Sequence, residues 1–207
     1  QGRPDGKRPF GHATLFDFQL ARLEQHRAKH EGTDEGFALS SEDCAKLQME
    51  SFQYHHRYIC LLQLEDYSGV VRDTMRNLKM FDFVEEYADS DELAWNLQQF
   101  RPQVLMLQTR AAASQYLQDD EYATATKEIQ AGISRIRDFY EERSRHEQAA
   151  HCPEIAGLEH WLREIDRKRP LTKREQLERD LTNAVQDEDY ERAARVRDAL
   201  RKLKPKD

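Results

Sequence analysis

Histidines and cysteines are the residues of this sequence whose side chains could bind a metal ion or act as nucleophiles. His26 and His30 stand four residues apart, a spacing that places them on one face of a helix and could hold a metal. A zinc-protease helix needs glutamate directly after its first histidine, and Arg27 stands there instead. We therefore interpret the pair as part of a solvated polar face.

A second pair, His55 and His56, lies in another predicted helix, with His55 on the apolar stripe. One interpretation is a polar site inside a helical groove. The other, which we favour, is a core histidine that is hydrogen-bonded to a neighbouring side chain.

A third group, His146, His151 and Cys152, has suitable side chains for a metal but none of the ligand spacings of known zinc sites. The remaining cysteines, Cys44 and Cys60, form no C-x-x-C pair with each other or with Cys152. We expect three reduced, mostly buried thiols of a cytoplasmic protein.

No constellation of residues supports catalysis. The sequence has no glycine-rich phosphate loop and no nucleophile elbow. Its acidic pairs lie mainly at predicted helix starts, where capping explains them. We therefore expect a protein that is not an enzyme and that has no catalytic residue, cofactor or metal.

The composition favours an all-α fold with a highly charged surface. Hydrophobic residues make up 38% of the 207 residues and charged residues 34%, and only 8 Gly and 6 Pro are present. No run alternates apolar and polar residues for long enough to predict a strand. No apolar run has the length of a membrane span and no signal peptide is seen, so we expect no membrane partner.

Charge is unevenly distributed along the chain, whose net charge is −7. Residues 166–207 contain 13 Lys and Arg against 10 Asp and Glu, a net charge of +3, which leaves −10 for residues 1–165. An acidic surface repels the phosphate backbone, so we expect nucleic acid to be an indirect partner at most.

Helical periodicity and capping residues predict a series of amphipathic helices. Thr14, Ser40 and Ser90 can each cap one of them. Pro102 should kink or break the helix that Ser90 begins. In order, the predicted segments are an extended arm over 1–11, helices over 14–30, 40–62, 67–88, 90–117 and 122–140, a loop over 146–153, and a helix that begins at Pro153.

One pattern recurs three times: helix, acidic turn, tyrosine, helix. The tyrosines are Tyr67, Tyr122 and Tyr190, with an aliphatic residue five positions before each and Val or Ala three positions after. The acidic turn lies at the positive N-terminal end of the following helix, where negative charge is stabilised. We therefore expect three helical hairpins with similar turns, each closed by its tyrosine.

The last hairpin carries the most specific pattern. Leu177 and Leu181 lead to an acidic hinge at 187–189, and the run Tyr190-Glu-Arg-Ala-Ala-Arg-Val-Arg-Asp198 follows. This segment resembles the UVR motif, the helical hairpin named after the excision-repair proteins UvrB and UvrC. The resemblance covers about thirty residues. It implies a protein–protein contact element.

Each helix of this tail has one predicted apolar face. The first face contains Leu177, Leu181, Ala184 and Val185. The second contains Tyr190, Ala193, Ala194, Arg197 and Leu200, and Leu203 continues it. Small alanines allow the two helices to approach closely, and Asp198 with Arg197 could bind the facing helix or a partner. We expect the partner-binding residues to be Tyr190, Ala193, Ala194, Arg197, Asp198 and Leu200.

The predicted fold is therefore an all-α stack of antiparallel helical hairpins, similar in topology to tetratricopeptide repeats, with a C-terminal UVR-type hairpin. A two-helix unit buries too little surface to be stable alone, so the hairpin should pack on the body or on another copy. The predicted domains are the arm 1–11, a helical-hairpin body over 12–150, a connecting helix and linker over 151–170, and the UVR-like hairpin over 171–207.

Three functions stay open at this point. The favoured one is a non-enzymatic adaptor whose UVR-like hairpin engages a partner protein or a second copy. The second is a DNA-repair accessory factor that touches DNA through a basic linker. The alternative interpretation of this linker is a solvated hinge. The third is a regulator of a stress-related kinase or Clp-protease system, although adaptors of that kind carry cysteine-based zinc sites that this sequence lacks. The linker residues are Arg167, Lys168, Arg169, Lys173 and Arg174.

Overall fold

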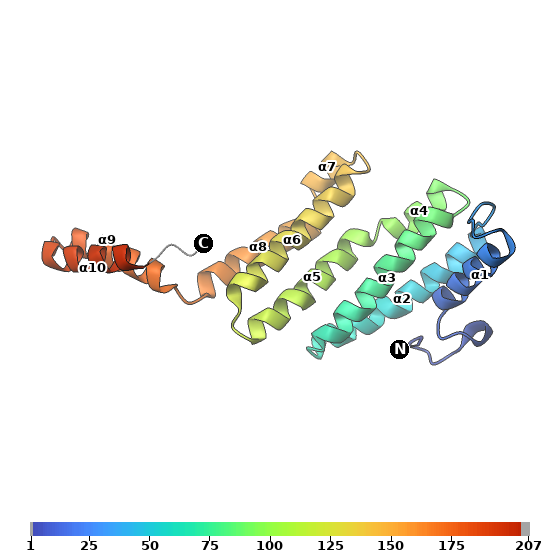
Figure 1. The fold of residues 1–207 in the computed structure, drawn as a ribbon, viewed down its shortest axis with the longest axis horizontal. Helices are drawn as coiled ribbons and strands as arrows, with labels where there is room; N and C mark the ends of the chain where they lie inside the picture. Colours follow the sequence, from blue (N-terminus) through green and yellow to red (C-terminus); the bar gives the residue numbers. More distant parts are fainter. Residues whose placement is uncertain (1, 204–207) are drawn as a thin grey trace. The chain divides into compact units, whose positions relative to one another are not determined.

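Residues 2–203 are described by the computed structural model of this chain, and within them the protein is all-α, as predicted (Figure 1). In that range the β-type pairing consists of a single bridge between Leu39 and Ala88. Gln1 of the predicted arm and residues 204–207 of the predicted hairpin domain lie outside the described residues.

The chain divides into two compact units, and the division falls between residues 164 and 165, inside one helix. The predicted domain limits at 150 and 170 differ from this division. Cys152, Ile155 and Leu158 are all buried, so most of the predicted connecting helix belongs to the core of the first unit.

The first unit contains a short 3-10 turn, Pro9–Gly11, followed by a succession of α-helices. They are α1 Leu15–Lys29, α2 Ser41–Gln63, α3 Tyr67–Tyr87, α4 Asp91–Gln98, α5 Arg101–Gln118, α6 Tyr122–Glu141, the short α7 His146–Ala150, and α8 Pro153–Lys168, which continues into the second unit. The second unit contains α9 Lys173–Gln186 and α10 Tyr190–Lys202.

The predicted caps are present. Thr14 and Ser90 each accept a hydrogen bond from the backbone N–H three residues later, and Ser40 forms a full capping box with Asp43. α4 ends at Gln98 and α5 begins at Arg101 with Pro102 in its first turn, which confirms the predicted break. The predicted loop over 146–153 is wrong in part, because residues 146–150 form one helical turn, α7, directly before Pro153.

Within the first unit, α2, α3, α5 and α6 lie side by side in chain order (Figure 1). The pairs α2–α3 and α5–α6 are antiparallel hairpins, each joined by a short turn. This arrangement agrees with the predicted stack of hairpins; the closer likeness to tetratricopeptide repeats stays a prediction. The residues of these helices line a pocket beside His55 and form a buried network of charges, which are described below.

The three hairpin turns predicted from the repeated tyrosine pattern have the same backbone geometry. Glu65, Asp120 and Glu188 each stand two residues before a tyrosine, with φ angles of 58°, 57° and 58°. In each turn the following acidic residue donates its N–H to the carbonyl oxygen five residues earlier, at 2.9, 2.8 and 2.8 Å. This is a Schellman ending with an acidic residue at the left-handed position that glycine usually takes.

We predict that Glu65→Gly stabilises the first unit by about 0.5–1 kcal/mol, because glycine adopts a positive φ without the steric cost that a Cβ imposes. Glu65 is exposed, so nothing else is disturbed. The measurement is urea unfolding followed by tryptophan fluorescence, since Trp95 and Trp161 both lie in the first unit. Glu65→Ala removes the same charge but keeps the Cβ, and an equal gain for both variants would contradict the backbone explanation.

The side chain of Glu50 on α2 is fully inaccessible to solvent. It forms an ion pair with Arg76 of α3 and lies 3.6 Å from Arg3 of the N-terminal arm. It also accepts hydrogen bonds from the backbone N–H groups of Leu15 at 2.7 Å and Phe16 at 3.2 Å. Glu50 therefore holds the start of α1, the arm and α3 together.

A second buried pair lies beside the first. Asp73 of α3 binds Arg57 of α2 through two hydrogen bonds of 2.5 and 2.8 Å. The ring of Tyr54 lies between the two pairs, with the guanidinium groups of Arg57 and Arg76 at 4.5 and 4.2 Å from its centroid. Burial is the main cause that lowers the pKa of Arg76. The two pairs thus form one charged network inside the body.

The N-terminal arm is folded onto the body and is not simply extended. Its backbone pairs with the segment just before α1, where the Arg3 N–H donates to the Ala13 carbonyl at 3.2 Å. Arg57 donates to the Gly2 carbonyl at 3.1 Å, which connects the arm to the charged network. Phe10 of the arm stacks on Phe18 of α1 at 4.3 Å.

Gly132 of α6 faces the fully buried Thr109 of α5. A Cβ on Gly132 would lie 2.8 Å from the Cβ of Thr109 and closer still to its Oγ1 and Cγ2. The absence of a side chain at 132 therefore sets the spacing of this hairpin.

No helix within residues 2–203 combines the length and the apolar character needed to cross a lipid bilayer.

Candidate functional site

The C-terminal hairpin begins with a capping box. Thr172 accepts from the Glu175 N–H at 3.2 Å, and the Glu175 carboxylate accepts from the Thr172 N–H at 2.8 Å. α10 begins in the same manner, because Asp189 accepts from the Arg192 N–H at 2.9 Å. These local bonds fix the ends of two short helices that pack against each other.

Two alanines form the buried centre of the hairpin. Ala184 of α9 is 0% exposed and Ala193 of α10 is 8% exposed, and they are the buried residues of these two helices. Small side chains at these positions allow a close helix pair, as predicted. The hairpin therefore buries little apolar surface of its own, far less than an independent domain needs.

The residues predicted to form the contact face of α10 fall into two groups. Ala193, Ala194 and Leu200 are buried or half-buried. Tyr190 is exposed, and so are Arg197 and Asp198, which form an ion pair with each other at 3.3 Å.

Two of the predicted packing positions are wrong. Arg197 does not lie on the packed side of α10, where the half-buried Val196 takes its place, and Val185 of α9 is 51% exposed. A single neighbouring helix covers only a narrow line of side chains, so residues at the edges of a wide apolar stripe stay outside. The predicted role of Tyr190 in closing the hairpin is also not observed, because this side chain is 69% exposed.

Val185 and Tyr190 stand on either side of the acidic turn and form an apolar tip to the hairpin. The turn contributes three carboxylates, from Asp187, Glu188 and Asp189, all exposed. Since large apolar side chains ringed by charge are typical of recognition surfaces, this tip is the candidate contact site of the second unit.

Residues 172–204 match the UvrB/uvrC motif. The comparisons with curated proteins and with solved structures gave no match. The UVR match covers only the tail, of which residues 172–203 are described, and it confirms the resemblance that the sequence pattern indicates.

The basic linker before the UVR hairpin is partly neutralised by neighbouring carboxylates. Arg169 binds Glu175 through two hydrogen bonds of 2.8 and 2.5 Å. Arg174 binds Glu178 at 2.9 Å. The other predicted nucleic-acid contacts form no ion pair within the described part of the chain, and they are Arg167, Lys168 and Lys173.

The Arg169 guanidinium is the main cause that lowers the pKa of Glu175 to about 2, with the Thr172 N–H and hydroxyl adding to the shift. Because the pKa is depressed in the folded hairpin, the contact stabilises α9 above the ordinary value of 4.5 and is lost as the pH falls towards 2. We predict that the amide resonances of Thr172 and Glu175 titrate in NMR spectra with a midpoint well below 4.5.

A Glu175→Gln variant should abolish this titration, because no carboxylate then caps the helix. A midpoint near 4.5 in the unmodified protein would show that Arg169 and Glu175 do not interact in solution.

The histidine and cysteine candidates occupy ordinary structural positions. The rings of His26 and His30 stack on each other at 4.1 Å, and His26 Nε2 lies 2.8 Å from the carbonyl oxygen of Glu35. Cys152 is buried with its thiol 3.1 Å from Glu154, and His151 Nδ1 contacts the Glu147 carbonyl at 2.9 Å. Within residues 2–203, no group of three or more such side chains could hold a metal ion.

Two of the three cysteines, Cys44 and Cys152, are buried and Cys60 is exposed, which agrees with the expectation of mostly buried thiols. Burial is the main cause that raises the pKa of both buried thiols, so they are held in the unreactive protonated form.

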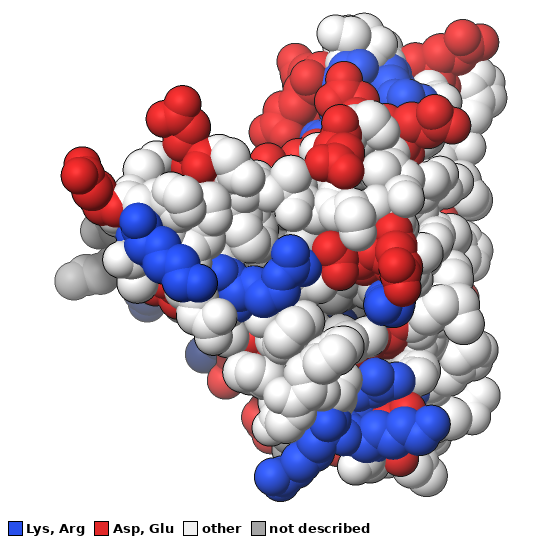
Figure 2. Space-filling model, turned by 90° about the vertical axis from the view of Figure 1, so that its right-hand side faces the viewer, with Lys and Arg blue, Asp and Glu red and all other residues white. Residues whose placement is uncertain are grey.

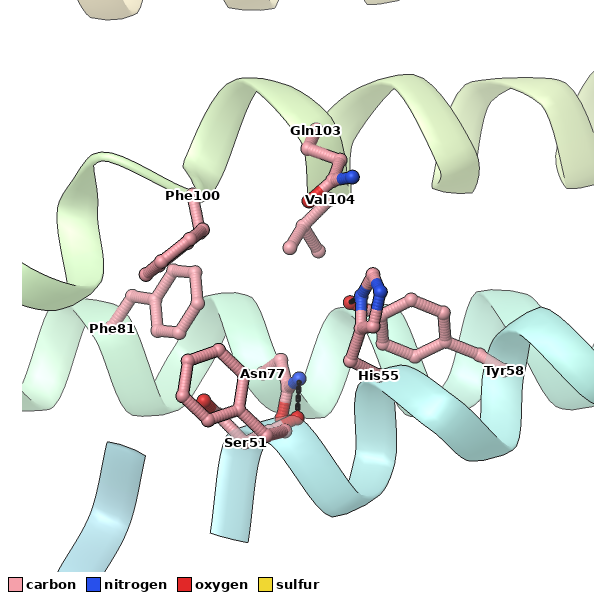
Figure 3. A pocket seen from close by; sticks show the side chains of 9 residues that line it. Ser51, His55, Tyr58, Asn77, Phe81, Phe100, Gln103 and Val104 are labelled. Carbon is pink, nitrogen blue, oxygen red and sulfur yellow. Dashed lines mark hydrogen bonds between the residues drawn. The ribbon is translucent and has the colours of Figure 1, made fainter. Parts of the chain in front are cut away.

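His55 has both features that the sequence left as alternatives. Its Nδ1 lies 3.0 Å from the Tyr58 hydroxyl, as expected for a histidine bonded to a neighbour. It also lines a pocket between α2, α3 and the start of α5 (Figure 3). Burial is the main cause that lowers the pKa of His55, with a contribution from His56.

The face of the molecule drawn in Figure 2 carries acidic side chains gathered mainly at its upper end and basic side chains in separate groups lower down. It presents no continuous basic surface of the kind that follows a nucleic-acid backbone.

Proposed function

We propose that this chain is a non-enzymatic adaptor whose UVR hairpin binds a partner protein through its apolar, acidic tip. The observation that supports this most directly is the exposure of Tyr190, at 69%, on a motif whose own buried centre consists of two alanines. A hairpin that leaves its largest aromatic side chain in water gains stability when another surface covers it.

The chemistry of the tip defines the complementary surface. Tyr190 and Val185 need an apolar hollow, and the carboxylates of 187–189 need a basic rim around it. The partner surface in this proposal is therefore an apolar pocket surrounded by Lys or Arg, on another protein or on a second copy.

The test is an affinity capture from the native cell extract with four forms of the chain: unmodified, cut after Arg169, Tyr190→Ala, and Tyr116→Ala. Tyr116 is a matched control, because it is an exposed tyrosine, 37% accessible, on α5 of the first unit. We expect one identified protein to be retained by the unmodified chain and the control, and to be lost with the other two forms.

Retention of that protein by the chain cut after Arg169 would contradict the proposal. Sedimentation equilibrium tests whether the partner is a second copy of this chain. In that case the unmodified chain should form a dimer and Tyr190→Ala should not.

A DNA-repair accessory role is the second candidate, since Arg167, Lys168 and Lys173 have no ion pair among residues 2–203. Three free cations predict weak binding whose affinity falls about 2.7 log units per log unit of salt on duplex DNA. Fluorescence anisotropy with a labelled duplex measures this slope, and neutralising the three residues should abolish it. The stress-kinase or Clp-protease regulator stays a prediction that rests on the motif alone.

A further inference from the structure

The pocket beside His55 is lined mainly by aromatic and uncharged polar side chains. It holds a volume of about 130 Å³ between α2, α3 and the start of α5. Five of its side chains form a buried floor, and four form a half-buried rim. The floor consists of Ser51, Tyr58, Asn77, Phe81 and Val104; the rim consists of Phe52, His55, Phe100 and Gln103.

One end of the pocket is aromatic. Phe52 and Phe100 meet edge to face at 5.6 Å and close this end together with Phe81. Figure 3 shows the Phe81 and Phe100 rings on one side of the space and His55 with Tyr58 on the other. An aromatic ring placed between them would contact ring edges and faces, as aromatic clusters do in protein cores.

The other end offers hydrogen bonds. His55 Nδ1 lies within hydrogen-bond distance of the Tyr58 hydroxyl, and His55 Nε2 has no hydrogen-bond partner among the described residues. The Gln103 amide on α5 likewise has no partner in residues 2–203, and it lies above the pocket in Figure 3. By contrast, the polar groups of the floor are satisfied: Asn77 donates to the Ser51 carbonyl at 3.1 Å, and Ser51 donates to the Gln48 carbonyl at 2.7 Å.

The lining excludes a charged ligand. None of the nine side chains is an acid, a lysine or an arginine, and burial lowers the pKa of His55, which favours its neutral form. An ionised group in such a site would lose its hydration without gaining a counter-charge.

We propose that this pocket binds one neutral aromatic ring carrying a single hydroxyl group, with the ring between Phe81, Phe100 and Val104 and the hydroxyl against His55 and Gln103. The volume agrees with a ligand of this size, since an engineered apolar cavity of about 150 Å³ binds benzene. A free phenol and the tyrosine side chain of a peptide both present such a ring with its hydroxyl group. This site is independent of the UVR hairpin and of the adaptor proposal.

The test is an NMR titration of the full chain with p-cresol, followed at the Val104 methyl resonances. We expect saturable shifts at Val104, binding about tenfold weaker for toluene, which lacks the hydroxyl, and none for benzoate. A Gln103→Leu variant should bring the p-cresol affinity towards that of toluene. Gln108→Leu, a half-buried glutamine on the same helix that does not line the pocket, is the matched control and should retain the preference.

N-acetyl-tyrosinamide distinguishes the two sources of the ring. Binding equal to or tighter than that of p-cresol identifies a peptide side chain, and selective binding of p-cresol identifies a free phenol. The absence of saturable shifts at Val104 with p-cresol, equal affinity for toluene, or an unchanged preference in Gln103→Leu would overturn the proposal.

Discussion

A Glu50→Gln variant should lose about 3 kcal/mol of unfolding free energy in the first unit, the largest effect we expect from a single isosteric change. The glutamine keeps the shape of the side chain but leaves Arg76, whose side chain is only 15% exposed, as a buried cation without its counter-charge. Arg3 loses the nearby Glu50 charge and keeps its ion pair with Asp5 at 2.9 Å. Removing one member of a buried pair is costly because the other member stays desolvated. Urea unfolding followed by tryptophan fluorescence measures the loss.

Glu42→Gln is the matched control for this change. Glu42 lies on the same helix, pairs with Lys46 at 2.7 Å, and has a side chain that is 76% exposed. Its loss should change stability by less than about 0.5 kcal/mol. A double-mutant cycle of Glu50→Gln with Arg76→Gln should give a coupling energy of about 1–3 kcal/mol. Similar losses of unfolding free energy for Glu42→Gln and Glu50→Gln would contradict the prediction that the charged network stabilises the body.

Gly132→Ala should destabilise the first unit by about 1–3 kcal/mol, although alanine favours helices. The new methyl group would overlap three atoms of the Thr109 side chain, including its Cβ, so a rotamer change of Thr109 cannot relieve the contact. α5 and α6 would have to separate. The same unfolding measurement applies.

The same substitution at Gly157 should change the stability in the opposite direction. Gly157 lies in α8 with open space within 4 Å of where a Cβ would lie, so Gly157→Ala should stabilise the protein by about 0.5–1 kcal/mol. Destabilisation at both glycines would show that the effect is general to glycine removal and not specific to the contact between α5 and α6.

Local chemistry made the helices predictable. Thr14, Ser40 and Ser90 cap helices because their hydroxyl groups satisfy backbone N–H donors close in sequence, and Pro102 breaks a helix for an equally local reason. The repeated tyrosine pattern was informative for the same reason, since a Schellman turn involves only six consecutive residues.

The charged network could not be predicted from periodicity alone. Glu50 stands three residues after Leu47 and four before Tyr54, on the buried side of α2, but a glutamate at such a position is typical of the edge of a polar face. Its burial depends on Arg3 and Arg76, which are remote in sequence. Spacing within one helix carries no information about such partners.

The pocket shows the same limit. His55 is a polar residue on the apolar stripe of a predicted helix, and this position indicated a site in a groove. Phe100, Gln103 and Val104 carried no such signal, because the first and last have the spacing of core residues. Only the break at Pro102 and the packing of α5 on α3 bring them over His55.

The position of the Glu50 network along the chain bears on how the protein folds as it is synthesised. Every group that Glu50 contacts belongs to the first 87 residues: the arm, the start of α1, and α3. On the ribosome these segments emerge before α5 and α6. The nascent chain can thus bring together all the partners of Glu50 while its C-terminal half is still being made.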